Sequence, residues 1–132
     1  MTVGDRARIL VVDDNDSMRH WLAEILTRAG HQIIQAADGA EACRISREVD
    51  VDLVILDLFM PVKDGIETLR ALRARAPGVP IIAISGGGAD DTGVDLLKAA
   101  VLLGAVRSME KPFTPTEMLE AVGKAVYPGR TR

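Results

Sequence analysis

Five polar residues of the sequence have side chains that could do chemistry together: Asp13, Asp14, Asp57, Ser85 and Lys111. Each comes at the end of a short apolar or mixed run, the pattern of a strand in a buried sheet. Because parallel strands bring their carboxyl ends to one edge of a sheet, we expect these side chains to meet there. Three carboxylates so close together repel one another unless one is protonated or a cation lies between them. An all-oxygen cluster of this kind suits Mg²⁺, with Mn²⁺ as a substitute.

These residue types together predict phosphoryl transfer. Asp57 can act as the nucleophile and form an acyl phosphate. The metal and Lys111 would neutralise charge on the equatorial phosphoryl oxygens, and Ser85 would donate a hydrogen bond to one of them. The sequence contains no nucleotide-binding loop of the GxxxxGK type, so the phosphoryl donor must be another molecule.

The elements that would position these residues follow from the hydrophobic pattern, in which short apolar runs alternate with longer amphipathic stretches. The pattern predicts strands over residues 9–12, 31–37, 53–56, 81–84 and 105–109. It predicts helices over residues 18–29, 40–49, 66–76, 94–103 and 115–126. The last helix has a strong start signal, with Thr114 as N-cap, Pro115 in the first turn and Glu117 three residues after the cap.

Five strands in alternation with five helices imply an α/β fold, with one parallel sheet covered by helices on both faces. The three wholly aliphatic strands should be central, and the mixed strands at 31–37 and 105–109 should be the edges. The strand order is then 2-1-3-4-5, which is that of a doubly wound, flavodoxin-like sheet. In this order Asp13, Asp14 and Asp57 flank the point where the strand order reverses, which is where such folds bind ligands.

Composition narrows the possible classes of protein. A length of 132 residues fits a single domain over 1–132, with a core from about 8 to 126 and short tails. A net charge of −3 and only 3% aromatic residues argue against direct binding of nucleic acid. The longest apolar run is far shorter than the roughly 20 residues needed to cross a bilayer. The one cysteine, Cys43, cannot form an intrachain disulfide, which predicts a cytoplasmic protein without a membrane partner.

The residues named above resemble a known family, the receiver domains of bacterial response regulators. The resemblance is carried by motifs in family order over nearly the whole chain: Asp13-Asp14, Asp57, Met60-Pro61-Val62-Lys63-Asp64-Gly65, Ser85 and Lys111-Pro112-Phe113. No output domain follows, so the chain is similar to single-domain, CheY-like regulators. Such a domain is not an enzyme on other molecules, and it assists only its own phosphorylation and dephosphorylation.

The resemblance implies a place in a two-component phosphorelay. Asp57 would accept a phosphoryl group from a histidine kinase or a histidine phosphotransfer protein, and a conformational change would signal to a protein target. Mg²⁺ would be held by the side chains of Asp14 and Asp57 and by the Phe59 carbonyl, with Asp13 helping through water. The Lys111–Pro112 peptide would be cis, which proline permits at low cost. We expect a monomer or a weak dimer.

Two other functions compete with this one. Asp14-Asn15-Asp16 after a strand also resembles the Asp-x-Asp start of haloacid-dehalogenase-type phosphatases. Those enzymes need a second acidic cluster late in the sheet and usually a cap, and this sequence offers neither. A phosphorylation-independent interaction module on the same fold is the second alternative. Retention of all five polar residues argues against it, because a site without chemistry could lose them.

Two departures from the family pattern concern how the signal leaves the site. The position three residues before Lys111, often aromatic in the family, is Ser108, and Phe59 is bulky for its place. Without an aromatic switch, we expect Ser85 and the glycine-rich segment 86–88 to carry the change instead, because glycines lower the cost of moving the backbone. Phosphorylation would then order residues 85–93 and shift the following helix.

Overall fold

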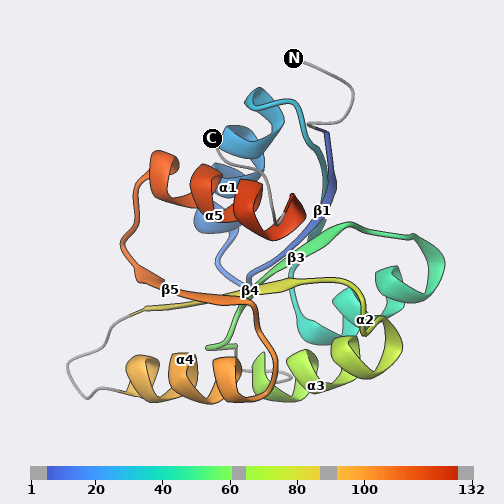
Figure 1. Ribbon diagram of the computed structural model, residues 1–132, viewed down its shortest axis with the longest axis vertical. Helices are drawn as coiled ribbons and strands as arrows, with labels where there is room; N and C mark the ends of the chain where they lie inside the picture. Colours follow the sequence, from blue (N-terminus) through green and yellow to red (C-terminus); the bar gives the residue numbers. More distant parts are fainter. Residues whose placement is uncertain (1–5, 61–64, 87–91, 128–132) are drawn as a thin grey trace.

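The aliphatic runs form the strands of one parallel sheet. The computed structural model describes residues 6–60, 65–86 and 92–127, with the side chains of 92–94 excepted. Within these ranges the sheet has five strands in the order β2-β1-β3-β4-β5, as the hydrophobic pattern predicts (Figure 1). The strands are β1 (Arg8–Val12), β2 (Gln32–Ala36), β3 (Leu53–Asp57), β4 (Ile81–Gly86) and β5 (Arg107–Lys111).

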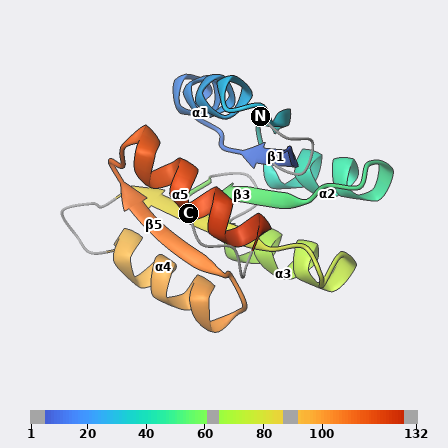
Figure 2. The ribbon, with the colours of Figure 1, turned by 45° about the horizontal axis from the view of Figure 1, so that its top comes forward.

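Helices cover both faces of the sheet. They are α1 (Asp16–Arg28), α2 (Gly39–Glu48), α3 (Gly65–Arg75), α4 (Thr92–Leu102) and α5 (Pro115–Val126). Helices α1 and α5 lie on one face, and α2, α3 and α4 lie on the other (Figures 1 and 2). None of the described helices combines the length and the apolarity that a bilayer span requires.

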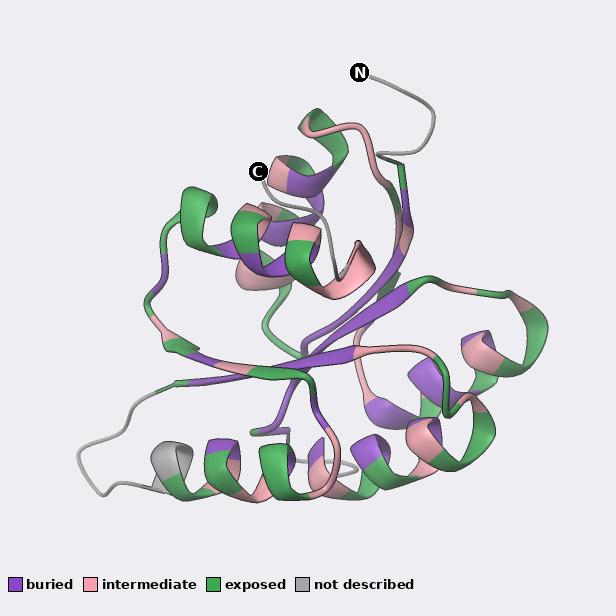
Figure 3. Ribbon diagram, viewed as in Figure 1, coloured by how far each residue is buried: buried purple, intermediate pink, exposed green. Residues whose placement is uncertain are grey.

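The alternation of side chains along each strand divides the core into two clusters. In β1, Ile9 and Val11 pack with α1 and α5, whereas Leu10 and Val12 pack with α2, α3 and α4. Central strands are therefore buried on both faces, while the helices keep their outer surfaces exposed (Figure 3). Strands buried on both sides cannot alternate apolar with polar residues, which explains their continuous aliphatic runs.

The last strand lies two residues later than its sequence pattern suggests. Residues 105–109 are the predicted range, but β5 runs from Arg107 to Lys111, which pair with Ile82 and Gly86 of β4. The Ala105 N–H donates to the Ala100 carbonyl (2.9 Å), so Ala105 belongs to the turn that follows α4 and not to the strand. Lys111 is therefore the last residue of its strand, and pairing to β4 holds its backbone in place.

The start of α5 confirms the capping box predicted from the sequence. The Thr114 hydroxyl accepts a hydrogen bond from the Glu117 N–H (3.1 Å), and the Glu117 carboxylate accepts one from the Thr114 N–H (2.9 Å). This cap ends the connection that begins at Lys111 and contains the cis Lys111–Pro112 peptide, which was expected from the family resemblance. Only residues 112–114 separate β5 from α5.

Helix α3 begins where its backbone touches the segment that follows β3. The Gly65 N–H donates to the Leu58 carbonyl (3.0 Å), and a Cβ atom on Gly65 would lie 2.1 Å from the Leu58 Cα. Only glycine permits this approach. Met60 is buried nearby in the core, whereas the Pro61–Asp64 part of the motif lies outside the described residues.

Gly65→Ala should therefore destabilise the protein by about 1–3 kcal/mol or more, because overpacking against backbone cannot be relieved by a side-chain rotation. The matched control is Gly123→Ala in α5, where an added Cβ would meet nothing within 4 Å. There alanine should stabilise by about 0.5–1 kcal/mol through its better helix propensity. Urea unfolding of both variants measures the two effects, and equal changes in the free energy of unfolding would contradict the assignment.

Candidate functional site

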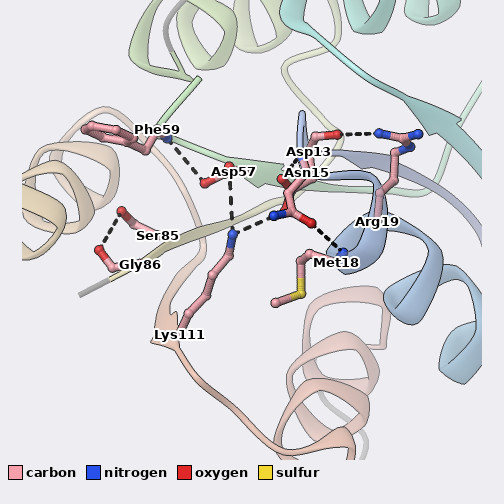
Figure 4. A network of polar contacts seen from close by, with 9 residues as sticks. All are labelled: Asp13, Asn15, Met18, Arg19, Asp57, Phe59, Ser85, Gly86 and Lys111. Carbon is pink, nitrogen blue, oxygen red and sulfur yellow. Dashed lines mark hydrogen bonds and ion pairs between the residues drawn. The ribbon is translucent and has the colours of Figure 1, made fainter. Parts of the chain in front are cut away.

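The carboxyl ends of three strands bring together an ammonium and two buried carboxylates (Figure 4). Lys111, at the end of β5, places its Nζ 3.2 Å from Asp13 Oδ2 and 3.8 Å from Asp57 Oδ2. Asp13 follows β1, and Asp57 is the last residue of β3. Strand order accounts for the meeting of these side chains. Strands β1 and β3 are neighbours, and only β4 lies between β3 and β5. The convergence predicted from the sequence is confirmed for these three side chains.

Asp14 completes an acidic cluster that opens toward solvent. One carboxylate oxygen from each of Asp13, Asp14 and Asp57 lies within 4.8 Å of the other two. Asp13 is fully buried, Asp57 is 3% exposed, and Asp14 is exposed. All the side-chain donors are hard oxygen atoms, and one side is accessible to water. This set fits Mg²⁺, which binds through a few carboxylates and keeps several of its waters.

Asp13 is bound through all of its polar groups. Its N–H donates to the Ala36 carbonyl (3.1 Å), and its own carbonyl accepts from Arg19 Nη1 (2.8 Å). Of its carboxylate oxygens, Oδ1 accepts from the Asn15 N–H (2.9 Å), and Oδ2 faces Lys111. The sequence analysis identified the Asp13 carboxylate and Lys111 but missed Arg19. The only sequence signal for Arg19 is that it is an arginine in the helix that follows the acidic pair.

Burial and repulsion make the Asp57 carboxyl a weak acid. Its pKa rises from the ordinary 3.8 to about 7, mainly because burial removes the carboxyl from water and next because the Asp13 carboxylate repels the charged form. Lys111 and the Phe59 N–H, which donates to Asp57 Oδ1 at 3.2 Å, offset part of the rise. Near neutral pH a proton and a metal cation would therefore compete for this carboxylate.

Ser85 and Phe59 are the remaining predicted site residues at the carboxyl ends of the strands. The Ser85 side chain is fully buried on β4, beside Asp57, and its hydroxyl reaches the carbonyl of the adjacent Gly86 only at 3.5 Å. So long a hydrogen bond is weak, and the hydroxyl can exchange it for a better acceptor. Phe59 is 64% exposed, and in Figure 4 its ring points away from the Asp57 carboxylate. Its contribution inside the site is made by the backbone.

Asn15 and Asp16, which gave the sequence its likeness to a phosphatase motif, have structural contacts in the first turn of α1. Asn15 is the N-cap, and its side chain accepts from the Met18 N–H (2.9 Å). Asp16 pairs with Arg19 (2.6 Å) and is exposed. Neither residue belongs to the acidic cluster of Asp13, Asp14 and Asp57.

The expected signalling route bypasses Ser108 and runs through residues 85–93, which the structure describes only in part. Ser108 is half-buried on β5 and pairs with Ala83 of β4. Residues 87–91, which include most of the glycine-rich segment, lie outside the described residues. The route through residues 85–93 accordingly stays a prediction.

Comparison with known proteins agrees with this geometry. The response regulator receiver domain family matches residues 9–123. Chemotaxis protein CheY of Thermotoga maritima is 34% identical over 118 residues, which cover 89% of this chain and 95% of that protein. Sporulation initiation phosphotransferase F of Bacillus subtilis is 34% identical over 117 residues, or 89% of this chain and 91% of that protein.

A solved structure shows the same architecture. The receiver domain of NtrX from Brucella abortus superposes with a TM-score of 0.83 at 30% identity, and the match covers 89% of this chain and 97% of that one. These similarities do not favour a phosphatase of the haloacid-dehalogenase type or a module that acts without phosphorylation. The chain belongs to the response regulator receiver domain family, and it is a phosphorylatable receiver of two-component signalling.

Proposed function

We propose that Asp57 is the residue that accepts the phosphoryl group. The observation that carries this proposal is the meeting of Lys111 with Asp13 and Asp57 at 3.2 and 3.8 Å, at the point where the strand order reverses. A carboxylate oxygen of Asp57 would attack the phosphorus of a phosphohistidine. The new O–P bond forms as the N–P bond breaks, and the histidine nitrogen leaves with the bonding electrons and takes up a proton.

The proposed metal site consists of the side chains of Asp13, Asp14 and Asp57 together with the Phe59 carbonyl. Asp14 and Asp57 would bind the ion directly, and Asp13 would act through water. Mg²⁺, or Mn²⁺ in its place, would supply positive charge next to the phosphoryl oxygens. The support is the all-oxygen cluster within 4.8 Å and the Phe59 backbone held at Asp57 by its N–H.

Lys111 and Ser85 would complete the site from the strands on the other side of Asp57. Lys111 already lies between the two buried carboxylates, so its ammonium can turn to a phosphoryl oxygen without being carried in from solvent. The Ser85 hydroxyl would exchange its long bond to the Gly86 carbonyl for a phosphoryl oxygen. That exchange would start the conformational change, which we place in residues 85–93 because Ser108 is too small to act as an aromatic switch.

The wider proposal concerns partners and setting. Residues 1–132 would work as one receiver domain, since a single sheet unites the elements from Arg8 to Val126. The phosphodonor would be a histidine kinase or a histidine phosphotransfer protein, and the output a protein target rather than nucleic acid. We propose a monomer or weak dimer that catalyses no reaction on other molecules. A cytoplasmic location is supported by the one cysteine, which allows no intrachain disulfide.

The phosphoacceptor assignment predicts that acetyl phosphate with Mg²⁺ adds one phosphoryl group to the wild-type protein and none to Asp57→Asn. The amide has no carboxylate oxygen with which to attack phosphorus. Asp50→Asn is the matched control, because Asp50 is an exposed aspartate outside the acidic cluster. Intact-mass spectrometry measures the added group. Labelling of Asp57→Asn to the wild-type level would show that another residue is the acceptor.

The raised pKa of Asp57 predicts how stability depends on pH when metal is removed with EDTA. Between about pH 4 and pH 7 the folded protein retains a proton at Asp57 that the unfolded chain has released. Stability from this group is therefore lost as the pH rises, at up to about 1.4 kcal/mol per pH unit. Asp57→Asn should remove that loss, so its advantage over wild type in urea unfolding should grow from pH 4 to 7 and then level off. A difference that stays constant with pH would contradict the shift.

The metal site predicts that millimolar Mg²⁺ raises the melting temperature of the wild-type protein by mass action. Asp14→Ala should abolish this rise, because it removes the exposed carboxylate of the cluster. Without metal the same variant should be as stable as wild type or more stable, since one repulsion is lost. Asp50→Ala, which changes the net charge equally, should keep the Mg²⁺ response. A wild-type melt that ignores Mg²⁺ would count against the site.

A further inference from the structure

Arg19, in the first half of α1, is held by three acceptors, of which Figure 4 shows the Asp13 carbonyl. Its Nη1 donates to the Asp13 carbonyl (2.8 Å), its Nη2 to Asp16 Oδ1 (2.6 Å) and its Nε to Gln35 Oε1 (3.2 Å). The side chain is only 11% exposed, although the side chain of its partner Asp16 is 75% exposed. Arginine is rarely so buried unless its donors are satisfied. The planar guanidinium fork satisfies them here from three separate segments.

The contact with the Asp13 carbonyl fixes one end of a peptide whose other end belongs to Asp14. The Asp13 N–H is held by the Ala36 carbonyl at 3.1 Å, so main-chain contacts hold Asp13 from both sides. The Asp14 carboxylate, in contrast, makes no hydrogen bond or ion pair with any residue that the structure describes. Its position in the cluster therefore depends on the backbone that carries it, and Arg19 makes one of the contacts that hold that backbone.

We propose that Arg19 is a positioning residue of the metal site, and that it acts by clamping the Asp13–Asp14 peptide so that the Asp14 carboxylate faces Asp13 and Asp57. The inference rests on the proposed metal site and adds a residue that touches none of the ion's expected ligand atoms. Groups that orient metal ligands in this way commonly change metal affinity when they are removed.

Position and charge have opposite effects on metal affinity, which makes the proposal easy to test. The guanidinium is a positive charge near a cation site, so by charge alone its removal would strengthen Mg²⁺ binding. Asp16 at 2.6 Å offsets part of that charge. If clamping the peptide dominates, removal weakens binding. The sign of the change separates the two effects.

The test is calorimetric titration of Mg²⁺ into the metal-free wild-type protein, Arg19→Met, Arg19→Lys and Arg28→Met. We expect Arg19→Met to bind Mg²⁺ about tenfold more weakly than wild type. Arg19→Lys should also bind more weakly, because one ammonium cannot reach three acceptors. Arg28→Met is the matched control: it lies on the same helix and changes net charge equally, but Arg28 is 78% exposed and pairs only with Glu24 among the described residues. The Mg²⁺ affinity of Arg28→Met should equal that of wild type.

Unchanged or tighter Mg²⁺ binding by Arg19→Met would overturn the proposal, as would wild-type affinity in Arg19→Lys. Melting in EDTA distinguishes a positioning role from a purely structural one. A purely structural role of Arg19 would lower the stability of Arg19→Met while leaving the Mg²⁺ affinity of the folded variant unchanged. If Arg19→Met does not fold, Gln35→Ala decides. It removes only the Nε acceptor, so weaker Mg²⁺ binding supports the proposal and unchanged binding refutes it. Failure of wild type itself to bind Mg²⁺ would refute the metal site, which is a separate result.

Discussion

The burial of two like charges at one end of an apolar sheet is the constraint on which the rest of the site depends. Asp13 and Asp57 are almost wholly removed from water, yet each must be able to carry a negative charge. Lys111 lies against both and offsets part of the repulsion, but the pKa of Asp57 still rises to about 7. The pairing of β1 with β3, which ends at Val12 and Leu56, stops directly before the two carboxylates and so fixes where their backbones meet. A cation is the group that would relieve the repulsion.

The topology explains why the charges gather at this end of the sheet, where the cluster reaches solvent through Asp14. Helix α1 leaves β1 on one face of the sheet, and α3 leaves β3 on the other (Figure 2). Connections that diverge from neighbouring strands leave the ends of those strands open, and open α/β sheets bind their ligands there. The same divergence needs a tight start to α3, which the glycine at position 65 provides by direct contact with Leu58. The site therefore depends on close backbone packing at Gly65 as well as on its charged side chains.

The site is also supported from outside its own residues. Asn15 caps α1 and donates its N–H to Asp13, and Arg19 donates to the Asp13 carbonyl from the same helix. Helix α1 therefore serves both to cover one face of the sheet and to hold the loop that carries the acidic pair. The loop that carries Asp13 is thus bound from both β2 and α1.

Much of this protein can be predicted from its sequence, because the strongest signals are local. Aliphatic runs that end in Asp13, Asp57 and Ser85 indicate buried parallel strands, and their order along the chain places the polar residues at one edge. The capping box at Thr114 is equally local. Other features required the tertiary structure. The exact extent of β5 depends on its pairing with β4, the pKa of Asp57 on what buries it, and the contacts of Arg19 on segments that come from α1, β1 and β2. Hydrophobic pattern and helix capping depend on a few neighbouring residues and can be predicted from the sequence. The burial of a carboxylate, its repulsion by another carboxylate and the contacts of Arg19 arise only when distant segments meet.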